Sequence, residues 1–157
     1  MKKLLLILSI LLLSLPIFAQ QSTDSATLTI RGNVPVIVSV TIQEGTNAQS
    51  LDMSSPGTYT FEVGTLTFRS NTDFNLTVDS TNGTGTDFLM ANADGDTITY
   101  TLSTTDGTTY QNGGTVLSQG RTTGNTTLTF EVTYTISDPL PNPGDYEDII
   151  TFNIAGQ

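Results

Sequence analysis

The sequence contains no histidine, no cysteine and no tryptophan. Without histidine or cysteine, the usual nucleophile and base pairs of enzymes cannot form, and nearly all transition-metal sites lose their ligands. Without cysteine no disulfide can stabilise the chain, so its stability must come from packing and hydrogen bonding. We therefore expect a protein that is not an enzyme and that carries no metal or other cofactor.

A catalytic pair of carboxylates is still possible, because the chain has 11 aspartates and four glutamates. Two carboxylates are enough for glycoside hydrolysis, so a carboxylate hydrolase is an alternative. Catalytic acids usually need a desolvated cleft that shifts their pKa. Most acids here lie in turns or among threonines, where solubility explains them, and the sequence nominates no catalytic pair.

One acidic run resembles part of a calcium loop. Asn92, Asp94 and Asp96 alternate, with Gly95 between the last two. The glycine is misplaced for such a loop, and no glutamate follows at its twelfth position. Because Asp-Gly strongly favours hairpin turns, the run predicts a solvated turn.

Basic residues are scarce, and two of the five open the chain. Lys2 and Lys3 precede the apolar run LLLILSILLLSLPIF, and Ala19 offers a small residue before a cut. This order is typical of a secretory signal peptide, and the run is short and interrupted for a membrane span. We expect a signal peptide at 1–19 and a single domain at 20–157.

Removal of that segment leaves a strongly acidic chain. Arg31, Arg69 and Arg121 remain against 15 acidic residues, a net charge of −12. Such a surface repels phosphate backbones and anionic lipid heads. We therefore expect no nucleic-acid partner and no membrane insertion after signal removal.

No segment has helical spacing of apolar residues, whereas two-residue alternation is common. Clear examples are the run TLTFEVTYTIS at 127–137 and the run YEDIITFNI at 146–154. Many of the 30 threonines occupy the outward phase of such runs, where β-branching suits a pleated surface. Short strands separated by glycine, asparagine and aspartate turns predict an all-β fold, an antiparallel β-sandwich of about seven to nine strands. A closed barrel is the alternative.

Apolar residues hold one even phase from Ala26 to Ile42. Pro35 interrupts the hydrogen-bonding ladder within this run, so we expect two strands, near 26–33 and near 35–43. The phase changes at Gly64, which predicts a bulge or bend. Val116 and Leu117 predict a short edge strand.

Asp148 shares its phase with Tyr146, Ile150, Phe152 and Ile154, so it should face the core near a strand end. A buried carboxylate must be hydrogen-bonded or it is costly. We expect Asp148 to hold a neighbouring loop by accepting backbone N–H bonds, with Tyr146 packed above it.

The closing motif PGDYEDIITFNI at 143–154, with Gly144, Tyr146 and Asp148, resembles the Gly-x-Tyr-x-Asp strand of spore coat protein U-like domains. Those domains include subunits of archaic chaperone–usher pili. The valine-rich early strand, the Leu-Asp-Met segment at 51–53 and the Arg-Ser-Asn strand end at 69–71 follow in a similar order. The cysteines common in that family are absent, and the chain closes on Ala-Gly-Gln instead of an apolar strand residue.

The resemblance implies an immunoglobulin-like sandwich that is exported to the periplasm, the cell surface or the medium. It implies a structural or adhesive role, such as a subunit of a surface fibre, with copies of itself or related subunits and a periplasmic chaperone as partners. Pilins of this type leave one strand position empty and fill it with an N-terminal strand of the next subunit.

A candidate donor strand is the set of alternate residues Ala26, Leu28, Ile30, Gly32 and Val34. The same residues could be the domain's own first strand. The sequence slightly favours the first strand, because only about six residues of the expected mature chain precede Ala26. That leaves no room for both a donor extension and a separate first strand, unless the first strand begins at Pro35.

The alternative function is a monomeric extracellular module that binds carbohydrate or another ligand through loops 81–97 or 104–115. Sugar-binding surfaces usually present exposed aromatic rings. The chain has no tryptophan, and Tyr110 is the only aromatic residue in a turn-rich loop, so this alternative is less favoured.

Overall fold

The computed structural model describes residues 27–157 of the chain, and residues 34–157 form one compact unit. The expected signal peptide and Ala26 lie outside the described residues. Within residues 27–157, no helix is long and apolar enough to cross a membrane.

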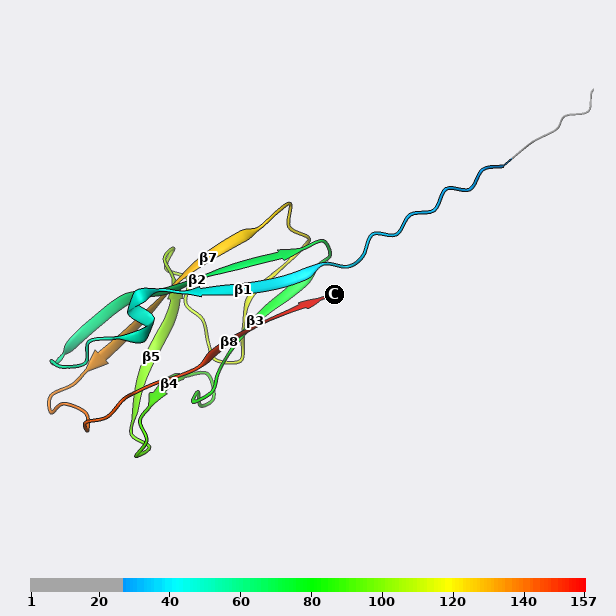
Figure 1. The fold of residues 1–157 in the computed structure, drawn as a ribbon. Coiled ribbons are helices and arrows are strands. Elements are labelled where there is room, and N and C mark those ends of the chain that lie inside the picture. Colours follow the sequence, from blue (N-terminus) through cyan, green and yellow to red (C-terminus); the bar gives the residue numbers. More distant parts are fainter. Residues whose placement is uncertain (1–26) are drawn as a thin grey trace, which may run out of the picture. The chain divides into compact units, whose positions relative to one another are not determined.

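The compact unit is an antiparallel β-sandwich, with eight strands in the described residues (Figure 1). One sheet has the order β1-β2-β7-β5-β4, and the other has the order β6-β3-β8. The predicted sandwich is confirmed, and the closed barrel is wrong because the strands form two separate sheets. The bounds are β1 (Val38–Glu44), β2 (Gly57–Ser70), β3 (Phe74–Ser80), β4 (Phe88–Ala91), β5 (Thr97–Thr104), β6 (Gly114–Gln119), β7 (Thr126–Ile136) and β8 (Ile150–Gly156), with a short 3-10 helix η1 (Thr46–Gln49) after β1.

The core follows from two-residue alternation. In β5, Ile98, Tyr100 and Leu102 are buried, whereas the threonines between them are exposed. Alternate side chains of a strand point to opposite faces, so each sheet presents one apolar face to the other. The buried apolar residues are Leu66, Phe68, Phe74, Leu76, Val78, Phe88, Met90, Ile98, Tyr100, Leu102, Phe130, Val132, Tyr134 and Ile136.

The predicted irregularity at Gly64 is confirmed. The pairing of β2 with β7 shifts between Glu62 and Gly64, which marks a bulge. A Cβ atom added at Gly64 would lie 2.9 Å from the backbone oxygen of Gln43 in β1. Glycine is therefore required where β1 crosses the bulge. The edge strand predicted around Val116 and Leu117 is also confirmed as β6, at the edge of the smaller sheet.

The strand predicted near 26–33 is wrong over its described part, because residues 27–37 contain no strand. The first strand, β1, begins at Val38, opposite Ser70, the last residue of β2. A strand needs a partner for its backbone groups, and β2 offers none beyond Ser70. The end of β2 therefore sets the start of β1.

The alternating run at 146–154 forms a strand over only its second part, since β8 begins at Ile150. Before it, Glu147 makes a single bridge to Ala91, through two backbone hydrogen bonds. The phase nevertheless holds across the whole run, because its even-numbered residues are less exposed than their neighbours.

Candidate functional site

One strand position beside β8 is empty in the described residues. A constant-type immunoglobulin domain pairs strands A-B-E-D in one sheet and C-F-G in the other. Here β1-β2-β7-β5 matches the first order, and β3 with β8 matches C and F. No strand of residues 27–157 takes the place of G, so β8 and β1 each keep one unpaired edge.

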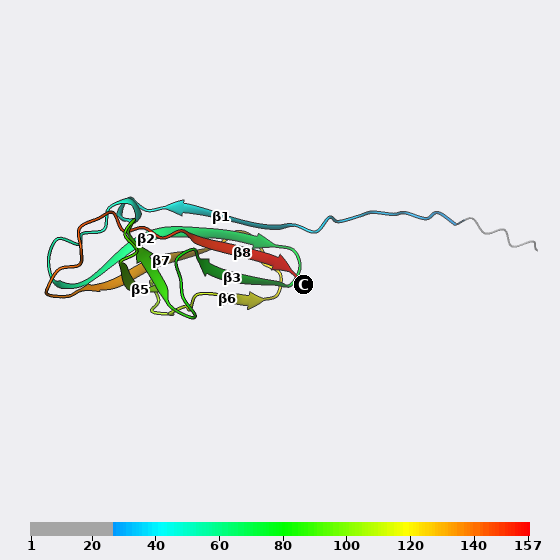
Figure 2. The same cartoon turned by 90° about the horizontal axis from the view of Figure 1, so that it is seen from below.

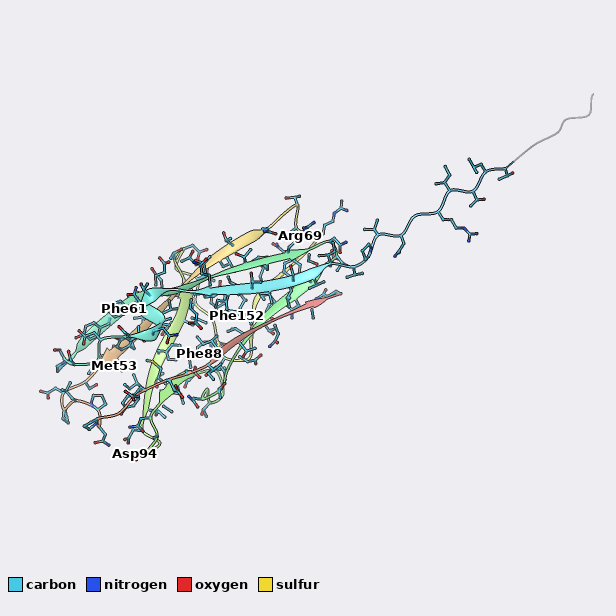
Figure 3. All side chains as sticks on the ribbon, viewed as in Figure 1. Met53, Phe61, Arg69, Phe88, Asp94 and Phe152 are labelled. Atoms are coloured by element: carbon cyan, nitrogen blue, oxygen red, sulfur yellow. The ribbon has the colours of Figure 1, made fainter. Side chains whose placement is uncertain are left out.

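A groove lies between these two edges, over the interior of the sandwich. Figure 2 shows β8 between β1 and β3, and Figure 3 shows Phe152 in the space between β1 and β8. The groove has a volume of about 700 Å³. Apolar residues from six strands line it, namely Ile42 of β1, Val63 of β2, Met90 of β4, Leu102 of β5, Phe130 and Val132 of β7, and Ile150 and Phe152 of β8.

Burial differs sharply between β8 and its paired neighbour. The inward residues of β3 are completely buried, with Phe74, Leu76 and Val78 at 0 % exposure. The inward residues of β8 are only half-buried. Across the groove, Ile42 of β1 is 51 % exposed. The apolar faces of both edge strands are therefore incompletely covered.

The groove is closed at one end. A Cβ atom added at Gly156, the last residue of β8, would lie 3.3 Å from Val38 Cγ2, at the start of β1. The groove lining begins further along β1, at Ile42, and includes residues 144–150 ahead of and into β8. In Figure 1 the two strands diverge from the end marked C. The opening is therefore widest near residues 144–150.

The residues of the closing motif line this wide end. Asp148 Oδ2 accepts hydrogen bonds from Ser80 Oγ at 2.6 Å and from Tyr100 Oη at 2.5 Å. Its Oδ1 accepts one from the backbone N–H of Asn82 at 3.1 Å. Burial, and then the Asp148 carboxylate, raise the pKa of Tyr100 far above its usual value, which keeps the hydroxyl protonated as a donor. The carboxylate therefore ties the start of β8 to the end of β3 and to β5.

Gly144 and Tyr146 shape the loop that precedes Asp148. Tyr146 Oη donates to the backbone oxygen of Asn142 at 2.9 Å, so it closes a local turn. A Cβ atom at Gly144 would lie 3.1 Å from the side chain of Asn92, so the loop passes close to the turn between β4 and β5. Both residues line the groove, and their positions indicate a structural part in building its wall.

The acidic run at 92–96 forms the hairpin turn that the sequence predicted. Asn92 Oδ1 accepts backbone N–H bonds from Asp94 and Asp96, and Gly95 has a φ of 87°. Asp96 Oδ2 accepts from the side chains of Asn142 and Asn92, and these bonds lower the pKa of Asp96. Asn92 Oδ1 and Asp96 Oδ2 therefore stabilise the turn itself and hold it to the loop that contains Asn142.

The candidate donor residues are highly exposed. Leu28, Ile30 and Val34 are 85 %, 86 % and 82 % exposed. A Cβ atom at Gly32 would have no heavy atom within 4 Å. The role of Ala26, Leu28, Ile30, Gly32 and Val34 stays a prediction, while the domain's first strand in the structure is β1.

Sequence reasoning missed a clamp just before β1. Asn71 Oδ1 accepts from the backbone N–H of Ile37 at 2.7 Å, and Asn71 Nδ2 donates to the backbone oxygen of Pro35 at 2.8 Å. The Asn71 backbone N–H also donates to the Ile37 oxygen at 3.0 Å. Residues 35–37 are therefore fixed to the turn after β2, although they form no strand.

Comparison with solved structures yields distant structural likenesses. No family model and no curated protein matches the chain. Among solved structures, a chain from the structure of a chaperone–usher pilus is similar, with a TM-score of 0.46 and 12 % identity over 91 % of this chain and 100 % of that chain. This likeness is too distant to place the chain in a family, and the groove stands on its own geometry.

Proposed function

We propose that the chain is an exported, non-enzymatic structural subunit, pilin-like or coat-like, that joins copies of itself into a surface fibre. The observation that carries this proposal is the groove between the unpaired edges of β1 and β8, where a strand position is empty over an apolar floor. A strand supplied by another copy would cover that floor and pair with both edges.

The segment at 27–34 has the chemistry that the groove needs. Leu28, Ile30 and Val34 share one face of an extended chain, and Gly32 on that face allows close backbone approach. The other face carries Thr27, Thr29, Arg31 and Asn33, which suit solvent. From residue 28 to 34 an extended chain spans roughly 20 Å.

Insertion would bury apolar surface of both the donor strand and the groove that receives it. Burying an aliphatic side chain stabilises by roughly 1.5–3 kcal/mol, and the donor supplies three. The half-buried residues of β8 and Ile42 of β1 would be covered at the same time. Unpaired sheet edges promote uncontrolled pairing, so a filled groove also removes that liability.

Export and partners follow from the same proposal. The expected signal peptide directs the chain to the periplasm, the cell surface or the medium. A subunit with an uncovered groove needs protection before assembly, so we include a periplasmic chaperone among its partners. Related subunits that carry a similar N-terminal strand are partners of the same kind.

The monomeric binding module remains the competing function. In that function a ligand would bind loops 81–97 or 104–115, where the side chains of Asp106 and Asn112 form hydrogen bonds within the protein. Asn112 Oδ1 accepts from the backbone N–H of Ser80, and Asp106 Oδ1 accepts from Thr104 Oγ1 and from the backbone N–H of Thr108. These contacts indicate a structural role for both side chains.

The proposal is tested with the mature protein, exported with its native signal and run on SDS gels with and without boiling. We expect a ladder of multimers that collapses only on boiling, because each joint buries a whole strand. Ile30→Asp should abolish the ladder, since the donor strand would then bury a charge against the apolar groove floor. Thr29→Asp adds the same charge on the outward face and should leave the ladder intact.

Thermal unfolding of both variants checks that the compact domain, which begins at Val34, is unchanged. A ladder that survives Ile30→Asp would contradict assembly through this segment. A single monomer band for the unmodified chain would favour the binding module.

A further inference from the structure

We infer that successive copies in the fibre contact each other end to end, with Arg69 and Arg121 of one copy against Asp145 and Glu147 of the next. This inference rests on the proposed strand addition. It goes further because it names a second interaction surface, outside the groove floor, and the direction of the inserted strand.

The hydrogen bonds of Asn71 fix the short segment that joins the donor strand to its own domain. Three hydrogen bonds of 2.7–3.0 Å hold residues 35–37 to Asn71, and β1 begins at Val38. If residues 28–34 lie in a neighbour's groove, only these three fixed residues join the two domains. Three extended residues span at most about 10 Å, so the domains must touch.

The two ends of the domain carry different charges. We define the clamp end by Arg69, Asn71, Asp73 and Arg121; Thr122 is hydrogen-bonded to the Ser70 oxygen, which places Arg121 there. We define the acidic end by the turn at 92–96 and the loop at 138–147, which the bond from Asn142 to Asp96 joins. Figure 3 shows Arg69 and Asp94 at opposite ends of the domain.

The charge difference between these ends is large. The clamp end carries two arginines and one aspartate, and the two arginines are exposed. The acidic end carries five acids and no base, and all but Asp96 are exposed, namely Asp94, Asp96, Asp138, Asp145 and Glu147. The named side chains therefore sum to a charge of +1 at the clamp end and −5 at the acidic end.

This difference selects the direction of the inserted strand. β8 runs from the acidic end toward the clamp end, where Gly156 meets Val38. In a donor antiparallel to β8, residue 34 leaves the groove at the acidic end of the receiving copy. The clamp end of the donor's own domain then lies against the acids of the receiving copy. A donor parallel to β8 leaves at the clamp end and brings arginines against arginines, which is unfavourable.

Two acids of the acidic end lie where the donor strand would leave the groove. Asp145 and Glu147 line its wide end. The chain expected after signal removal has a net charge of −12, so copies repel one another in general. Complementary ends offset this repulsion locally, and rim charges of this kind act mainly on the association rate.

A charge-swap experiment tests the contact. The mature chain is unfolded in guanidinium and diluted into buffer of about 20 mM salt, where surface charges are weakly screened, and assembly is followed by light scattering. Arg69→Glu with Arg121→Glu should slow assembly roughly tenfold, an effect on association rate within the range of charge steering. Asp145→Arg with Glu147→Arg should also slow it, although this pair reduces the overall negative charge.

The four changes together restore complementary ends at the original net charge, and we expect them to recover most of the rate. Thr101→Glu, Thr109→Glu, Gln111→Glu and Thr115→Glu together are the control, because they change the net charge by −4, as the arginine swap does, at exposed positions outside both defined ends. An increased rate for Asp145→Arg with Glu147→Arg, or no recovery in the fourfold variant, would overturn the inference.

The outcome for Ile30→Asp separates this inference from the proposed function. If Ile30→Asp abolishes assembly and the charge variants assemble at the unmodified rate, the end contact is wrong and strand addition stands. If Ile30→Asp assembles normally, the proposed function is wrong, and the end contact falls with it.

Discussion

Asp148 is the residue on which the wall of the groove most depends. Its carboxylate accepts from Ser80, Tyr100 and Asn82, which belong to the end of β3, to β5 and to the turn after β3. It lies two residues before β8 begins. The three bonds therefore fix where the edge strand of the smaller sheet starts.

We predict that Asp148→Ala lowers the free energy of unfolding by about 1–3 kcal/mol. Tyr100 is only 5 % exposed, so its hydroxyl would lose its acceptor where water does not easily replace it. Urea unfolding measures the change. Asp145→Ala, an exposed acid three residues earlier, is the control and should change stability by less than about 0.5 kcal/mol. Equal effects of the two substitutions would contradict the assigned role.

At the residue scale, the sequence predicts which side chains face inward but not what they meet. The even phase of Asp148 indicated a carboxylate near the core that accepts a backbone bond. Its side-chain partners Ser80 and Tyr100 lie 68 and 48 positions away, so no local pattern could name them. Asn71 is similar, because its partners Pro35 and Ile37 lie more than 30 positions away.

At the element scale, the sequence predicted local features such as the bulge, but it did not predict where a strand begins when this depends on its pairing partner. The bulge at Gly64 was predictable because a glycine coincided with a change of apolar phase. The start of β1 was not, because it depends on where β2 ends, at Ser70. The even phase of the apolar residues runs on before Val38 without a strand. The continued alternation at 28–34 thus has no partner in the described residues of its own chain.

The empty strand position predicts that a supplied strand will stabilise the domain. We would join a second copy of residues 26–34 after Gln157 through a flexible linker, in the chain that carries Ile30→Asp at its own N-terminus. β8 ends beside the closed end of the groove, so the added strand can run back antiparallel to β8. Burial of three aliphatic side chains should raise the unfolding midpoint by on the order of 10 °C, with the protein still monomeric.

The control for this variant carries aspartate at the copied position of Ile30, which keeps the linker and the length unchanged. Calorimetry compares the two proteins. Equal midpoints would mean that the groove between β1 and β8 does not accept this strand.

At the scale of the whole molecule, composition predicted the acidic character but not its distribution. The arginines are separated by 52 positions in the sequence, yet the turn after β2 brings Arg69 and Arg121 to the same end. The segments 92–96 and 138–147, which carry the acids, are likewise far apart in the sequence and are joined by the bond from Asn142 to Asp96 and by the close approach of Gly144 to Asn92. The charged ends are therefore a property of the topology.

The same holds for the groove, the central feature of the molecule. Alternating runs predicted a sandwich and its approximate number of strands. A missing strand leaves no mark in a sequence pattern, because the residues that would pair with it look like any other edge. The empty position became visible only when the order β6-β3-β8 was known.

The most direct test of the account is amide hydrogen exchange of the assembled protein against the Ile30→Asp monomer. Strand addition predicts strong new protection in three segments together, namely residues 28–34, β1 and β8, because each gains backbone partners. The paired strands β2 and β7 should change little and serve as the internal reference. Unchanged exchange in β1 and β8 on assembly would contradict the claim that another copy fills the groove.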